Sequence, residues 1–93
     1  MPPATTFEQF RHDALAQGCD EVLVRDWPAE IVLGEHAHPF SAHALVVRGE
    51  MWLRRGHEEQ HLGVGDTFEV ERDTPHAERY GSDGATLWVK RFH

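Results

Sequence analysis

Three histidines carry the clearest chemistry in this chain. His36 and His38 are two residues apart, so on an extended strand both imidazole rings leave the same face. His76, directly after Pro75, could supply a third imidazole from another strand. Neutral imidazole is a common ligand of transition metals, and three protein ligands leave positions open for a substrate. The sequence therefore predicts a divalent transition metal (Fe, Zn, Ni, Mn or Cu) bound by these three histidines.

Short elements must position these side chains. Residues 6–17 carry apolar side chains at helical spacing, with Thr6 as N-cap and Gly18 as terminator, and predict one short helix that covers an open end or face of the strand region. From residue 19 onward the pattern is typical of strands, with turn signals that include Gly49-Glu50 and Ser82-Asp83-Gly84. The expected strands are residues 21–25, 29–33, 44–48, 51–54, 67–71 and 85–89. This spacing predicts an antiparallel sandwich or small barrel, with an N-terminal segment at 1–18 and one barrel domain at 19–93.

The composition excludes several classes of protein. The 93 residues suit one small domain, and a net charge of −7 argues against nucleic acid or anionic membranes as partners. Cys19 is the only cysteine, which excludes an intramolecular disulfide and a cysteine-based zinc cluster. A signal peptide is not expected, and the sequence contains no apolar run near the roughly 20 residues of a membrane span. A cytoplasmic protein is the default expectation.

Two sequence segments resemble the two motifs of the cupins. The first is His36-Ala37-His38 followed by Gly49, and the second is Gly65-Asp66 followed by Pro75-His76. The resemblance covers about residues 20–92. It implies an all-β, antiparallel, jelly-roll-like cupin barrel behind a short N-terminal helix, with the metal held inside the barrel by His36, His38 and His76. Because small cupins commonly dimerise, it also implies a homodimer.

Several motif positions differ from the cupin pattern. Counting back from Gly49, the glutamate that is the usual fourth metal ligand in cupins falls on Ala42. The other departures from the motifs are Glu30, Glu71, Asp73 and Tyr80.

Two residues are candidates to replace the missing carboxylate. Strand alternation places positions 42, 44 and 46 inward and His43 outward, unless a bulge near Pro39 changes the register. Glu78 lies two residues beyond His76, about 6–7 Å along the strand on the same face. It could be a distant ligand, an orienter of a histidine or a general base, or it could pair with an arginine at the barrel rim.

The predicted site supports two classes of function. A metal bound by imidazoles alone keeps its full positive charge, which favours anionic or bidentate oxygen ligands. One hypothesis is a dioxygenase- or isomerase-like enzyme acting on a small oxygen-rich or anionic molecule, with Glu78 and Tyr80 as catalytic proton-handling residues and Tyr80 at the pocket mouth. The other is a non-catalytic module that binds or senses a small ligand. Fold alone does not choose between them.

Residues 57–61, His-Glu-Glu-Gln-His, match the zinc-protease pattern H-E-x-x-H, which requires a helix. Gly56 and Gly63 leave too few residues for one, and on a strand the two histidines would stand about 13 Å apart. We therefore predict a solvated hairpin strand.

Trp52 is expected on the opposite face from Met51 and Leu53. An outward tryptophan is either partly covered by the N-terminal helix or anchors a dimer interface, and the interface is favoured.

Overall fold

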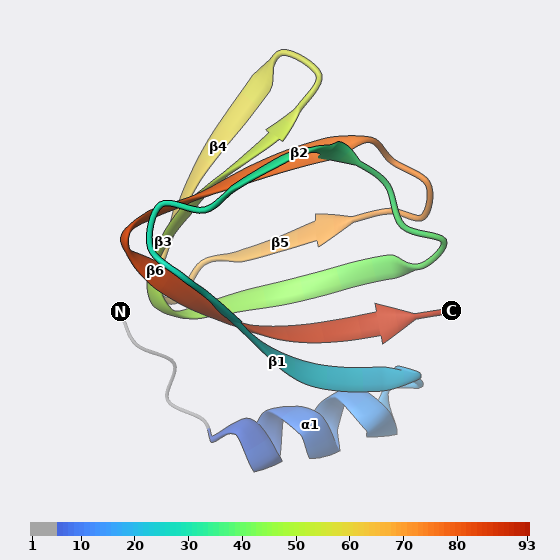
Figure 1. The fold of residues 1–93 in the computed structure, drawn as a ribbon. Coiled ribbons are helices and arrows are strands. Elements are labelled where there is room, and N and C mark those ends of the chain that lie inside the picture. Colours follow the sequence, from blue (N-terminus) through green and yellow to red (C-terminus); the bar gives the residue numbers. More distant parts are fainter. Residues whose placement is uncertain (1–5) are drawn as a thin grey trace.

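The computed structural model describes residues 6–93 and contains one helix and six strands (Figure 1). All of the strand pairs in this part of the chain are antiparallel. The predicted all-β barrel with a short N-terminal helix is therefore confirmed. The elements are α1 (Phe7–Ala16), β1 (Glu21–Trp27), β2 (Val32–His36), β3 (Ser41–Arg55), β4 (Glu58–Gly63), β5 (Thr67–Val70) and β6 (His76–Phe92).

Two long strands, β3 and β6, form the frame of the barrel. They pair with each other along most of their length, while β1 and β2 pair with β6, and β4 and β5 pair with β3. The turns predicted at Gly49-Glu50 and Ser82-Asp83-Gly84 were wrong, because both strands continue through these positions. The glycines instead allow sharp bends, with φ of 77° at Gly49 and 71° at Gly84, and the β3–β6 register shifts on both sides of Gly49.

The expected strand at 29–33 is also displaced, since β2 begins only at Val32. Ala29 and Glu30 form a turn, and Glu30 has a φ of 59°. The only other non-glycine residue with positive φ among residues 6–93 is Asp73, at 61°. Glu30 and Asp73 occupy two positions at which the cupin motifs have glycine. At both positions a non-glycine residue therefore adopts a backbone conformation that favours glycine, which stores strain.

Replacing Glu30 with glycine is expected to stabilise the protein by about 1 kcal/mol. The left-handed conformation costs a non-glycine residue about 1–2 kcal/mol, and the greater flexibility of glycine in the unfolded chain offsets part of the gain. The Glu30 side chain is exposed, so little packing is lost. Thermal denaturation should show a Tm about 4–8 °C higher. Glu58→Gly, at an exposed position of β4, is the matched control and should lower Tm; an equal decrease in Glu30→Gly would contradict the presence of strain at Glu30.

The inner faces of the bent strands form one core. Its largest fully buried side chains are Val46, Met51, Leu53 and Leu62. Toward β1 and β5 the core continues with smaller or less buried residues, including Ala44, Phe68, Leu87 and Val89. Positions 42, 44 and 46 face inward as the alternation predicts, because Ala42 and Ala44 line a cavity and Val46 is fully buried.

Helix α1 covers one outer face of the barrel, beside β1 (Figure 1). Phe7 and Phe10 both pack against Trp88, with ring centroids 5.5 Å apart in each pair. The side chain of Thr6 accepts a hydrogen bond from the backbone N–H of Gln9 at 3.1 Å, which confirms the predicted N-cap. Within residues 6–93, no helix is long and apolar enough to cross a membrane.

The segment with the H-E-x-x-H pattern is a hairpin, as predicted. His57 lies in the turn and His61 on β4, where its Nε2 is 2.9 Å from Glu50 Oε2.

Trp52 lies outside the core, stacked on His61 with centroids 4.7 Å apart and covered by the Arg79 guanidinium at 3.9 Å. The proposed cover from the N-terminal helix was wrong, because α1 packs on Trp88 instead. A homodimer anchored by Trp52 stays a prediction.

Candidate metal centre

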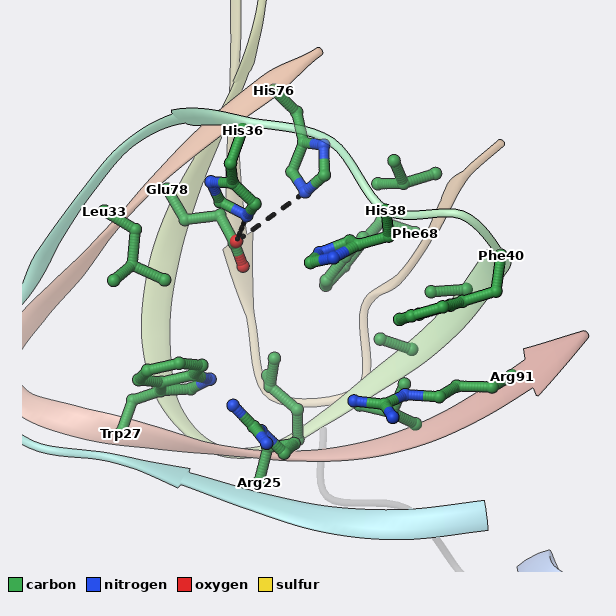
Figure 2. Close-up of a pocket in the computed structure, with 15 residues that line it drawn as sticks. Arg25, Trp27, Leu33, His36, His38, Phe40, Phe68, His76, Glu78 and Arg91 are labelled. Carbon is green, nitrogen blue, oxygen red and sulfur yellow. Dashed lines mark ion pairs between the residues drawn. The ribbon is translucent and has the colours of Figure 1, made fainter. Parts of the chain in front are cut away.

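The structure brings His36, His38 and His76 together at one end of a cavity inside the barrel (Figure 2). Their ligand nitrogens lie within 4.8 Å of one another. The rings of His36 and His76 have centroids 4.3 Å apart, and those of His38 and His76 are 5.2 Å apart. Only His76 is fully buried; the other two are half-buried and reach the same space from the end of β2 and the loop after it.

A bulge in β2 directs His36 inward. Leu33 pairs with Glu78 and His36 with His76, so β2 has one residue more than β6 in this interval. Strict alternation would place residues 33 and 35 on one face and His36 on the other. The extra residue reverses the alternation, and both Leu33 and His36 line the cavity.

Backbone carbonyls orient two of the imidazole rings. The Nδ1–H of His36 donates to Gly34 O at 2.7 Å, and the Nδ1–H of His76 donates to Thr74 O at 2.9 Å. With Nδ1 carrying a hydrogen, the neutral form of each ring presents the lone pair of Nε2 to the cavity. Metal-binding histidines in proteins are commonly held in this way.

Glu78 reaches the histidine cluster from β6. Its Oε2 is 3.3 Å from His36 Nε2 and 3.8 Å from His76 Nε2 (Figure 2), and its side chain is 11% exposed. The Tyr80 hydroxyl donates to Oε1 at 2.7 Å. The alternative in which Glu78 pairs with an arginine at the rim was therefore wrong.

Tyr80 lies in the core and not at the pocket mouth, contrary to our expectation. It is 3% exposed, and its ring stacks on Trp27 with centroids 5.2 Å apart. Burial, together with the Glu78 carboxylate, raises the pKa of Tyr80 far above its ordinary value of 10. The hydroxyl therefore stays protonated and acts as a hydrogen-bond donor.

The donor set fits a divalent transition metal. Two imidazole nitrogens and a carboxylate oxygen converge at 3.3 Å and 3.8 Å, and such electron-rich atoms repel one another unless a cation or a proton lies between them. Burial, with further contributions from His76 and His36, lowers the pKa of His38 below 6.5. A lowered pKa keeps this imidazole neutral, which is the form that binds a metal.

The cavity beyond the cluster has a volume of about 120 Å³. Its walls are mainly apolar and come from β3, β5 and β6, where Ala42, Phe68 and Leu87 are representative. The lining residues that sequence reasoning missed include Arg25, Phe40 and Arg91. A signal was available for the arginines, since Arg25 shares the strand parity of Trp27 and Arg91 that of Val89.

His43 is excluded as the fourth ligand of this site. It lies on the outer face of β3, where its Nδ1 is 3.7 Å from Glu69 Oε1 and its ring packs on Phe92. With Glu69 and Glu71 it forms a separate group of ligand atoms within 4.8 Å of one another, and both acidic residues are exposed. Glu78 is the carboxylate near the three histidines.

The barrel and its internal histidine cluster define a class of small β-barrel proteins with an imidazole-rich cavity. The family model for the cupin domain matches residues 22–90, so the chain belongs to the cupin family. Among curated proteins, no sequence matches the chain.

Solved structures share this fold. A chain from the structures of the DMSP lyases RdDddP and RnDddQII has a TM-score of 0.71 and 25% identity over 77% of this chain and 37% of that one. The DMSP lyase DddQ from Ruegeria pomeroyi DSS-3 has a TM-score of 0.67 and 27% identity over 76% of this chain and 37% of that one. A cupin superfamily protein from Desulfitobacterium hafniense DCB-2 has a TM-score of 0.65 and 14% identity over 80% of both chains. The present chain thus spans well under half the length of the two lyases.

Proposed function

We propose that this cupin is a metal-dependent enzyme acting on a small, oxygen-rich or anionic molecule that binds in the barrel cavity. His36, His38 and His76 hold the metal, and Glu78 handles a proton beside it. The observation that carries the proposal is the position of Glu78 Oε2, 3.3 Å and 3.8 Å from two imidazole Nε2 atoms in a largely buried site.

A bound divalent metal supplies Lewis-acid activation of a substrate oxygen or, if it is iron, activation of dioxygen. The residues of the chain supply position and proton transfer. Glu78 accepts or returns a proton at Oε2, while the Tyr80 hydroxyl holds Oε1 at 2.7 Å. Because Tyr80 contacts Glu78 and does not line the cavity, it is a positioning residue in this scheme.

Two of the solved neighbours, at 25% and 27% identity, are described as DMSP lyases, which supports an enzyme. Since the present chain covers 37% of each, this support extends to the class of protein and leaves the reaction and substrate open.

Replacing Glu78 with glutamine is expected to lower turnover by about 10²–10⁴-fold, the range for loss of a general acid–base group. The amide keeps the size of the side chain and the hydrogen bond from Tyr80. Metal-loaded protein would be incubated with a panel of short organic acids, hydroxy acids and sugars, with product detection by NMR and oxygen uptake measured for the iron form. Metal content, measured alongside, should stay at the wild-type level.

The second candidate is a non-catalytic module that binds or senses a small ligand. The cavity volume of about 120 Å³ favours it, because it lies below the 300–1,000 Å³ of typical small-molecule sites and encloses little substrate. Ligand binding to the metal-loaded protein without any conversion would favour this module. Turnover that is equal in wild type and Glu78→Gln would contradict the role of Glu78.

A further inference from the structure

The cavity has a second charged region opposite the histidine cluster. Arg25 enters from β1 and Arg91 from β6, and both side chains line the cavity. Figure 2 shows both arginines at the end of the cavity away from His76, with Arg25 beside Trp27 and Arg91 beside Phe40. Their strands are paired, with Arg25 opposite Leu87 and Arg91 opposite Glu21.

Arg91 has hydrogen-bonding capacity that the chain leaves unused. Its Nη1 donates to Glu21 Oε1 at 3.1 Å, and its guanidinium stacks on Phe40 at 4.5 Å. Its Nε is buried and has no hydrogen-bond partner among the described residues. A buried guanidinium N–H without an acceptor is unfavourable. Nη2 also has no hydrogen-bond partner among the described residues, so the guanidinium keeps N–H donors for an anionic oxygen in the cavity that it lines.

Arg25 adds a second positive charge, on an exposed side chain that forms no ion pair with the described residues. Its guanidinium lies over the Trp27 ring at 4.9 Å and, within residues 6–93, has no carboxylate within 4 Å. Glu78, at the opposite end, is the only acidic residue among the described residues that line the cavity. Two guanidinium groups line this end of the cavity, and although Arg25 is exposed and Arg91 is paired with Glu21, together they make this end the positive one, which would attract an anion.

We infer that the cavity binds a short carboxylic acid, with its carboxylate between Arg91 and Arg25 and its opposite end at the histidine–Glu78 cluster. The inference rests on the proposed function and names its substrate class. Guanidinium groups match the planar carboxylate with paired N–H donors. The apolar walls between the two ends, with Phe68 and Leu87 among them, suit an aliphatic segment of a few carbons, and the volume of about 120 Å³ sets that length.

Isothermal titration with butyrate, its neutral analogue butyramide and inorganic phosphate tests the inference, on both zinc-loaded and metal-free protein. Butyrate is expected to bind at least about tenfold more tightly than butyramide or phosphate. Arg91→Gln and Arg25→Gln should each weaken butyrate binding by at least about tenfold. Arg11→Gln, which removes one exposed positive charge from α1, is the matched control and should bind as wild type does.

Two features of the design keep its outcomes distinct. The Arg91–Glu21 pair joins β1 to β6, so Arg91→Gln risks a folding defect; Arg25 makes no such pair, and Arg25→Gln carries the test without that risk. In metal-free protein, the butyrate affinity depends on the arginine end of the cavity without any contribution from a metal. Metal content is a separate measurement that tests the proposed metal centre. Equal affinity for butyrate and butyramide, tighter binding of phosphate, absence of butyrate binding, or wild-type affinity in both arginine variants would each overturn the inference.

Discussion

Zinc or cobalt added to metal-free protein is expected to raise its free energy of unfolding by about 2.7 kcal/mol when the free metal concentration is 100 times the dissociation constant. The metal binds the folded cluster of His36, His38 and His76, whereas the unfolded chain does not hold these side chains together. For a domain of this size the Tm should rise by about 10–20 °C, measured by circular dichroism at fixed pH.

Replacing His38 with alanine should remove most of this stabilisation. The His38 imidazole makes ring contacts but no hydrogen bond to the described residues, so its loss leaves the backbone-anchored rings of His36 and His76 in place. Loss of a residue that hydrogen-bonds a metal ligand can weaken metal binding by roughly 100-fold. Loss of His38, itself a proposed ligand, should weaken metal binding by at least as much. At the same metal concentration the shift then falls to about 0.4 kcal/mol.

His61→Ala is the matched control for this experiment. His61 is a surface histidine of the H-E-x-x-H segment and lies outside the cluster, so this variant should keep the full stabilisation. An equal shift in wild type and His38→Ala would contradict the account, because the metal would then bind elsewhere. The group of His43, Glu69 and Glu71 is the alternative location, and His43→Ala would identify it.

Replacing Gly49 with alanine is expected to destabilise the barrel by more than about 4 kcal/mol, an exceptional effect for one methyl group. The added Cβ would overlap the carbonyl oxygen of Gly84 and lie 2.9 Å from Ala85 Cα, where β3 and β6 bend together. Both atoms belong to the backbone, so no side chain can move aside. Since small domains are stable by only about 5–15 kcal/mol, urea denaturation should show a severe loss of folded protein.

Gly56→Ala separates the clash from the backbone conformation. Gly56 has a φ of 59°, comparable with the 77° of Gly49, but an added Cβ there meets nothing within 4 Å. Its substitution should therefore cost only about 1–2 kcal/mol, the conformational penalty alone. Similar losses in the two variants would show that the bend at Gly49 relaxes, and would contradict the close approach of β3 to Gly84.

Much of the fold could be predicted because strand alternation depends only on local sequence. Side chains on a strand alternate between its two faces, so once one of positions 42, 44 and 46 is known to face inward, the other two follow. The bends at Gly49 and Gly84 could not be distinguished from turns, because a glycine with positive φ serves either purpose. The outcome depends on the long pairing of β3 with β6, between residues far apart in the sequence.

The candidate site also has features that the sequence predicts and features that it does not. The three histidines could be identified from their types and spacing, and the structure brings their nitrogens together. The inward direction of His36 depends on a bulge in β2, and no residue in this segment indicates that bulge in the sequence. The role of Glu78 and the direction of Arg91 depend on contacts with Tyr80 and Phe40, which are set by packing between strands.

Elemental analysis of the purified protein, beside a His36→Ala/His76→Ala double variant, tests the central claim most directly. The wild-type protein is expected to hold about one transition-metal ion per chain, as purified or after reconstitution, and the variant almost none. Comparable metal content in the two proteins, or none in the wild type even after reconstitution with iron, zinc, nickel, manganese and copper, would contradict a metal centre at these histidines.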